Sequence, residues 1–169
     1  MKDPTTDAVP FHVKNFGGKR NTSYIDCILV VVIKEKLTDV LQIFDKTDGN
    51  ISTNFVVGEG ENEVIETVEY KELYGLPPRG GMLGSENLAS ILSICIASPA
   101  GELSEYQVQS LIPLMSYFCG TYFIPLNRVF PGENAANLPW YDILNTLGSI
   151  LVGESLRVVG EEEEKSDDI

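Results

Sequence analysis

The fold is decided by one stretch, Leu138-Pro139-Trp140-Tyr141-Asp142-Ile143-Leu144-Asn145-Thr146-Leu147-Gly148-Ser149-Ile150-Leu151-Val152-Gly153. Apolar residues recur in it at three- and four-residue steps, which places them on one face of a helix: Trp140, Ile143, Leu144, Leu147, Ile150 and Leu151. Pro139 suits the first helical turn because its φ is fixed and it has no N–H, and Gly153 predicts the helix end. A single apolar stripe must be buried, so we expect the other elements to pack around this helix.

The remaining pattern predicts a small α+β domain. Residues 24–33 are β-branched and apolar, which is typical of a buried strand, and residues 34–44 change to a helical period. The other predicted elements are strands over 51–57 and 63–71, helices over 85–98 and 104–118, and short strands over 121–124 and 154–159. We therefore expect a single compact α+β domain over 24–160, with a small mixed or antiparallel sheet and about four helices packed on it. An extended N-terminal arm (1–23) and an acidic, solvated C-terminal tail (161–169) complete this prediction.

Composition excludes several classes of protein. The chain of 169 residues has 43% hydrophobic and 22% charged residues, which is typical of one folded soluble domain. Its three cysteines have no paired spacing, which favours a reducing, intracellular location. No apolar run reaches the ~20 residues of a membrane span, and the first residues lack a signal-peptide core. We therefore expect no membrane partner, and a net charge of −13 argues against direct nucleic-acid binding.

The charge is unevenly distributed along the chain. Residues 59–72 carry six glutamates against one lysine, and residues 161–169 are acidic again. By contrast, residues 73–160 hold only nine charged residues among 88, about 10%, whereas an exposed surface usually carries roughly 25–35%. We infer that part of this charge-poor half is covered by a partner.

No catalytic or cofactor motif is recognisable. His12 is the only histidine, and nothing near it in the sequence suggests a nucleophile. The loop that begins Gly58-Glu59-Gly60 lacks the third glycine of a dinucleotide-binding loop, and the Walker and G-x-S-x-G patterns are absent. The glutamates of 59–72 could hold a cation, but a solvated strand pair is the simpler interpretation. The sequence thus predicts no catalytic residue, no cofactor and no metal.

Two functions follow from these observations. The first is a non-enzymatic structural or assembly subunit of a larger complex, such as a virion capsid or tail component, which associates with other protein subunits including copies of itself. The alternative is an acidic adaptor or inhibitor that binds a basic partner surface. An enzyme that uses Arg79 or the glutamates ranks third. The candidate partner contacts are Phe11, Phe16, Glu61, Glu63, Arg79, Glu161 and Glu162.

Overall fold

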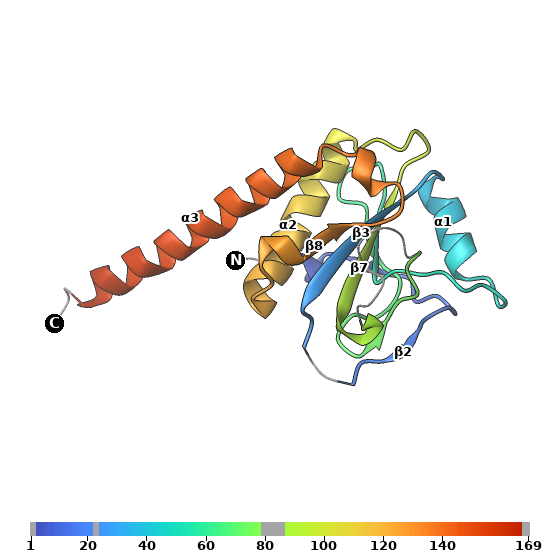
Figure 1. Ribbon diagram of the computed structural model, residues 1–169, viewed down its shortest axis with the longest axis horizontal. Helices are drawn as coiled ribbons and strands as arrows, with labels where there is room; N and C mark the ends of the chain where they lie inside the picture. The colour runs from blue at the N-terminus through green and yellow to red at the C-terminus, as the bar shows by residue number, and fades with distance from the viewer. Residues whose placement is uncertain (1–2, 22–23, 79–86, 167–169) are drawn as a thin grey trace.

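The computed structural model describes residues 3–21, 24–78 and 87–166, with side chains up to residue 153 (Figure 1). A six-stranded sheet has the order β1-β5-β4-β7-β3-β8. Its strands are β1 (Val9–Pro10), β5 (Val64–Glu66), β4 (Phe55–Val57), β7 (Ile91–Ala97), β3 (Cys27–Ile33) and β8 (Val129–Pro131). The strands β4, β7, β3 and β8 are parallel, whereas β5 runs antiparallel to β4 and β1 runs parallel to β5. A separate antiparallel pair joins β2 (Gly18–Lys19) to β6 (Leu73–Tyr74).

In the described part of the chain, three α-helices cover the sheet, which makes a mixed α/β single domain and confirms the predicted fold class. They are α1 (Leu37–Phe44), α2 (Glu105–Tyr122) and α3 (Trp140–Ser166), with short 3-10 turns η1 (Pro4–Thr6), η2 (Leu88–Ser90), η3 (Leu126–Arg128) and η4 (Ala135–Asn137). The helices number three rather than about four, and most of the sheet is parallel. Among the described residues, no helix is both long enough and apolar enough to cross a membrane.

The sheet separates two cores because its side chains alternate between faces. Ile28, Val30 and Val32 of β3 face the core that includes α2 and α3. Cys27, Leu29 and Val31 face the opposite core, to which α1 contributes Val40 and Phe44. Alternation with a period of two is what a strand backbone imposes. The helices α2 and α3 therefore lie on one face of the sheet and α1 on the other (Figure 1).

The predicted helix over 85–98 is wrong. Residues 91–97 form β7, in which every residue is buried between β4 and β3. A strand buried on both faces lacks polar alternation, so an apolar run there cannot be distinguished from a buried helix by periodicity. Part of the low charge of residues 73–160 follows from this burial, because the chain itself shelters β7 and the inner face of α2.

Two helices run further than their sequence signals predict. A capping box formed by Ser104 and Gln107 opens α2. That helix then passes Pro113 and ends at Tyr122, so the predicted strand over 121–124 is absent. The helix α3 continues beyond Gly153 to Ser166, which replaces the predicted strand over 154–159 and includes the first part of the acidic run. Figure 1 shows this distal half of α3 extending away from the domain.

Candidate functional site

The sheet has a switch point between β3 and β7. The chain leaves β3 through α1 on one face and leaves β7 through α2 on the opposite face. Adjacent parallel strands whose connections diverge in this way leave a crevice outside their carboxyl ends, where ligands of open α/β sheets bind. The carboxyl end of β3 is therefore the place in this fold to search for a site.

A pocket of about 200 Å³ lies at the carboxyl ends of β3 and β8, and we call it the carboxyl-end pocket. Its lining combines an apolar wall with one ammonium, one carboxylate and one carboxamide: Val32, Ile33, Lys34, Ile43, Ile51, Pro78, Glu133 and Asn134. The polar residues come from the segments that follow β3 and β8, while Ile43 belongs to α1. A mostly apolar cavity with a few converging polar groups is the usual form of a small-ligand site.

The turn after β8 positions the polar side of this pocket. The N–H of Gly132 donates to the carbonyl oxygen of Val30 at 2.7 Å, and the N–H of Val32 donates to that of Glu133 at 3.0 Å. A Cβ at Gly132 would lie 2.7 Å from the Cγ1 atom of Val31, so only glycine fits there. Asn134 has φ of 61°, and its Nδ2 donates to the carbonyl oxygen of Val32 at 3.3 Å. Backbone bonds thus fix Glu133 and Asn134 against the end of β3.

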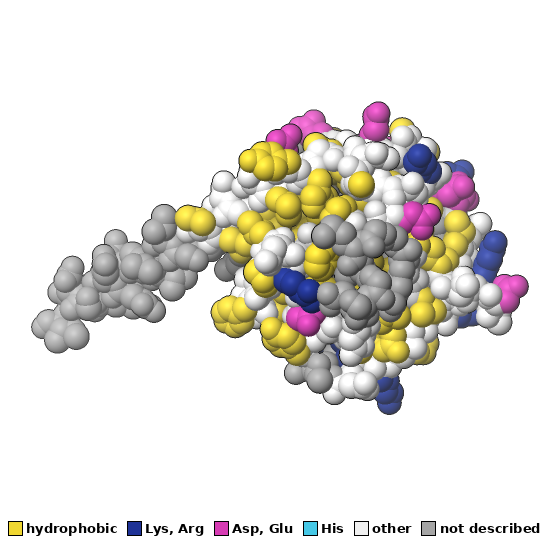
Figure 2. Space-filling view, in the orientation of Figure 1, with side chains coloured by type: hydrophobic (Ala, Val, Ile, Leu, Met, Phe, Trp, Pro, Cys, Tyr) yellow, Lys and Arg dark blue, Asp and Glu magenta, His cyan; other side chains and the backbone are white. Residues whose placement is uncertain are grey.

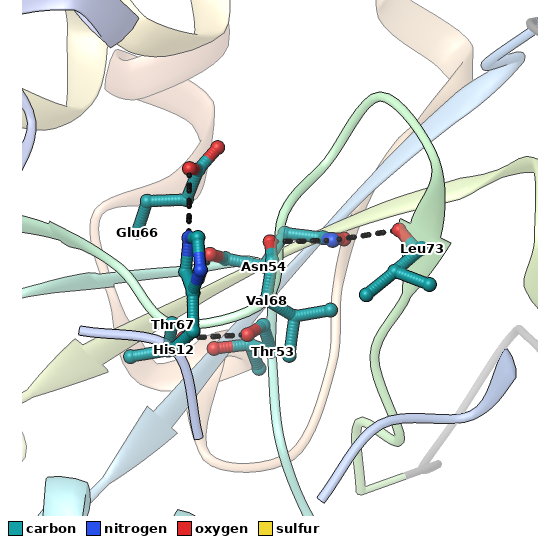
Figure 3. A network of polar contacts seen from close by, with 7 residues as sticks. All are labelled: His12, Thr53, Asn54, Glu66, Thr67, Val68 and Leu73. Carbon is teal, nitrogen blue, oxygen red and sulfur yellow. Dashed lines mark hydrogen bonds and ion pairs between the residues drawn. The ribbon is translucent and has the colours of Figure 1, made fainter. Parts of the chain in front are cut away.

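A second polar cluster surrounds Asn54 at the amino end of β4 (Figure 3). Its Nδ2 donates to the carbonyl oxygens of Val68 and Leu73, both at 3.2 Å. Its Oδ1 accepts from Arg20 at 3.2 Å and from the N–H of Ser93 at 3.2 Å. Burial lowers the pKa of Arg20 to about 10. Both the oxygen and the nitrogen of the Asn54 carboxamide are hydrogen-bonded to protein groups. We therefore assign this cluster a structural role.

The residue types do not fit a zinc site. Such a site needs at least three ligands among His, Cys, Asp and Glu, and the described part of the chain brings no such group together. His12 lies on the N-terminal arm, where its Nε2 is 3.4 Å from Glu66 (Figure 3). Burial raises the pKa of the thiols of Cys95 and Cys119, the latter to about 11, so both remain protonated at neutral pH and are poor ligands.

The residues predicted as partner contacts lie elsewhere in the structure. Phe11 and Phe16 are each 46% exposed on the N-terminal arm. Glu61 is exposed in the β4–β5 turn, and the Oε2 of Glu63 accepts from the N–H of Gly60 at 2.9 Å, which closes that turn. Arg79 lies outside the described residues, and residues 161 and 162 belong to the described backbone of α3. None of the described contacts lines the carboxyl-end pocket.

Sequence reasoning missed the residues that do line the pocket. Lys34 follows the predicted strand directly, which is a weak signal that a charge stands at a strand end. Glu133 and Asn134 carry no signal in the sequence, because β8 has only three residues, too few to show a period.

Solved structures share this fold. No protein-family model matches the sequence, and no curated protein matches it. An AmpD derivative aligns with a TM-score of 0.66 at 10% identity, over 87% of this chain and 98% of that one. The N-acetylmuramoyl-L-alanine amidase LysC from Clostridium intestinale URNW aligns with a TM-score of 0.55 at 12% identity, over 83% and 97%. The amidase AmiD from E.coli, in complex with anhydro-N-acetylmuramic acid-L-Ala-D-gamma-Glu-L-Lys, aligns with a TM-score of 0.52 at 17% identity, over 66% and 50%. The chain thus has the fold of these amidases.

This likeness corrects the functional expectations drawn from the sequence. A non-enzymatic structural subunit, a virion component and an acidic adaptor or inhibitor are all contradicted, because the structures that share the fold are amidases and endolysins. The expectation that the chain is not an enzyme is wrong on the same finding. The low charge of the second half does not by itself indicate a partner, because it also reflects the burial of β7 and of the inner face of α2 within the domain.

Proposed function

We propose that this chain acts on peptidoglycan-type glycopeptides and hydrolyses the amide that joins the muramoyl sugar to its peptide. The observation that carries the proposal is the alignment with AmpD, which spans 98% of that protein and therefore involves the whole domain. The bond is the one that the names of the LysC and AmiD amidases specify.

The carboxyl-end pocket offers the chemistry for the peptide side of such a ligand. Lys34 presents an ammonium for a peptide carboxylate, and Ile33, Ile43 and Ile51 form an apolar wall for a methyl or methylene group. The chain has a net negative charge, and Lys34 is the one cation among the described residues that line the pocket. It is therefore the group in this pocket that can attract a carboxylate.

Glu133 is the one carboxylate among the described residues that line the pocket. It is exposed, and a carboxylate oxygen can accept a proton. In the proposed reaction, Glu133 takes a proton from water as the water oxygen attacks the amide carbonyl carbon. That proton passes to the leaving nitrogen when the carbon–nitrogen bond breaks. The backbone bonds described above hold Glu133 at this place without a metal ion.

The experiment uses the glycopeptide seen with AmiD, anhydro-N-acetylmuramic acid-L-Ala-D-gamma-Glu-L-Lys. The purified chain is incubated with this compound, with and without a chelator, and mass spectrometry follows the separated sugar and tripeptide. Calorimetry measures binding in parallel. We expect binding and slow release of tripeptide that the chelator does not abolish. The absence of both binding and product at millimolar glycopeptide would refute the proposal.

A further inference from the structure

A polar hollow of about 230 Å³ lies between η1, the start of β5 and α2, and we call it the α2 pocket. Its walls combine apolar groups with two carboxamides and a hydroxyl: Pro4, Asn62, Val64, Gln109, Ser110 and Pro113. It differs in kind from the surface at the base of α3, where Figure 2 shows hydrophobic side chains gathered. Apolar side chains alone do not identify a ligand, whereas polar groups specify the atoms that a ligand must present.

The fold holds the walls of the α2 pocket in place without a ligand. The Oγ of Ser104, at the start of α2, donates to the carbonyl oxygen of Glu59 in the β4–β5 turn at 3.3 Å. On the other side of the pocket, η1 packs directly on α2. The carboxylate of Asp3 caps η1 by accepting from the N–H of Thr5 at 2.8 Å. The pocket is therefore preformed, which lowers the cost of ordering it when a ligand binds.

The polar side chains of the α2 pocket are available to a ligand. Among the described residues, no hydrogen bond uses the side chain of Asn62, Gln109 or Ser110. Each carboxamide carries N–H donors beside an oxygen acceptor, and the hydroxyl can donate or accept. Three side chains thus bring both kinds of hydrogen-bonding group to one small hollow.

Pro113 adds a backbone acceptor at the same place. It lies in the interior of α2 and has no N–H, so the carbonyl oxygen of Gln109, four residues earlier, lacks its usual helical donor. Residues four apart share one face of a helix, and both of these residues line the pocket. A proline in a helix interior is destabilising. Its position here leaves a carbonyl oxygen unpaired next to the unpaired carboxamides.

We propose that the α2 pocket binds one uncharged pyranose ring. Each hydroxyl group of a sugar both donates and accepts, so adjacent hydroxyls match the N–H and oxygen of a carboxamide. The rings of Pro4 and Pro113 offer apolar contact for the C–H face of the sugar. The pocket is smaller than the roughly 300 Å³ at which drug-sized sites begin, which limits the ligand to about one ring.

The charge and the density of polar groups disfavour other ligands. Asp7 is the one charged residue among the described residues that line the pocket, and the chain has a net charge of −13, so an anion is repelled. A peptide unit presents one N–H and one carbonyl oxygen, whereas a sugar ring presents several hydroxyl groups in a similar volume. The sugar therefore uses more of the available donors and acceptors.

The α2 pocket is separate from the carboxyl-end pocket. No described residue lines both, and β4 and β7 lie between β5 and β3 in the sheet. Sugar binding at the α2 pocket does not depend on the proposed amide hydrolysis. Each of the two proposals can fail while the other holds.

The test is a titration of the isotope-labelled full chain with the methyl glycosides of glucose, galactose and mannose, followed by amide NMR shifts. A ligand of this size binds with a dissociation constant on the order of 1 mM, so each sugar is added to about 20 mM. We expect at least one sugar to give saturable shifts at residues 62–64 and 109–110, with the signals of residues 33–34 and 133–134 unchanged. The absence of saturable shifts at residues 62–64 and 109–110 with all the sugars overturns the proposal.

A blocked, uncharged alanine, N-acetylalanine methylamide, tests the ligand class. It is titrated in the same way as the sugars and should give no saturable shift at these residues. If it binds as tightly as the best sugar, the pocket recognises amides and the assignment of a sugar is wrong.

Variants locate the binding. Gln109→Leu should raise the dissociation constant of the sugar about fivefold through loss of one hydrogen-bonding side chain. The matched control is Gln42→Leu, because Gln42 is also an exposed helical glutamine but lies on α1, outside the pocket. This control should bind like the wild type. Unchanged affinity in Gln109→Leu, or an equal loss in both variants, overturns the proposal.

Pro113→Ala separates binding from stability. It returns an N–H to the carbonyl oxygen of Gln109 and removes the proline ring from the pocket. We expect a higher melting temperature together with severalfold weaker sugar binding. A role of Pro113 in the structure alone would leave the sugar affinity unchanged, and that result would contradict its place in the pocket.

Discussion

The guanidinium of Arg20 donates a 3.2 Å hydrogen bond to the carboxamide oxygen of Asn54, across 34 residues of sequence. The same guanidinium donates to the carbonyl oxygens of Tyr70 at 2.7 Å and Ala89 at 2.6 Å. Through these bonds one side chain joins the N-terminal arm to the start of β4, to the segment before β6 and to η2. Part of the predicted arm is therefore built into the domain by specific contacts.

Replacing Arg20 with methionine should lower the free energy of unfolding by about 2–4 kcal/mol, because several half-buried acceptors lose their donors. Methionine keeps most of the apolar stem, so the loss reports mainly on the hydrogen bonds. Urea unfolding measures the effect. The control is Lys19→Met at the neighbouring exposed position, which should change stability by less than about 0.5 kcal/mol. Equal stability of both variants would contradict the assignment of this network.

The contribution of Tyr70 to the free energy of unfolding should fall as pH rises from 10 towards 12. Burial among aromatic rings raises the pKa of Tyr70 from 10 to about 12. The folded state therefore holds the phenolic proton in a range where the unfolded state releases it, and this contribution to stability is complete below pH 10 and lost towards pH 12. Denaturant unfolding at pH 9, 10 and 11 measures the slope.

Tyr70→Phe should show a shallower decline above pH 10 than the wild type. Part of the decline should remain, because burial also raises the pKa of Cys119 from 9 to about 11. The exposed Tyr141→Phe serves as control and should follow the wild-type curve. Identical slopes in wild type and Tyr70→Phe would show that the phenol of Tyr70 does not carry the effect.

Phe123→Gly should stabilise the fold by about 1 kcal/mol, because Phe123 caps α2 in the left-handed conformation that glycine adopts without cost. Phe123→Ala removes the same ring but keeps the Cβ, so it should show no comparable gain. Both variants are compared with the wild type by urea unfolding. A gain for alanine equal to that for glycine would mean that the ring, rather than the backbone, is the source.

Glu133→Gln should slow release of the tripeptide by about 100-fold or more, which is the usual contribution of a general base, while binding of the glycopeptide persists. Lys34→Met should raise the dissociation constant by about tenfold through loss of one charge-assisted contact. Both side chains are exposed, so neither substitution should change the melting temperature relative to the wild type. Glu35→Gln and Lys36→Met are matched exposed controls outside the pocket. If the controls behave like the pocket variants, the reaction takes place elsewhere.

The residues of the candidate site lie far apart in the sequence, so no local pattern predicts that they come together. The carboxyl-end pocket forms because β8 pairs with β3, which places Glu133 about one hundred residues away from Lys34 in sequence but beside it at the sheet edge. A three-residue strand such as β8 has too few residues to show a period. The missing catalytic motif in the sequence therefore says little about which side chains the fold brings together.

The sequence by itself determined the elements whose apolar pattern is local. It located β3, α1, the β4–β5 pair, the capped start of α2 and the apolar stripe of α3, since each buries one face that repeats with its own period. Only the tertiary structure decided that residues 91–97 are a central strand, that α2 runs on to Tyr122 and α3 past Gly153 to Ser166, and that the domain has the fold of the amidases. The physical reason is that parallel pairing joins segments far apart, and no local pattern encodes which neighbours a buried strand will have.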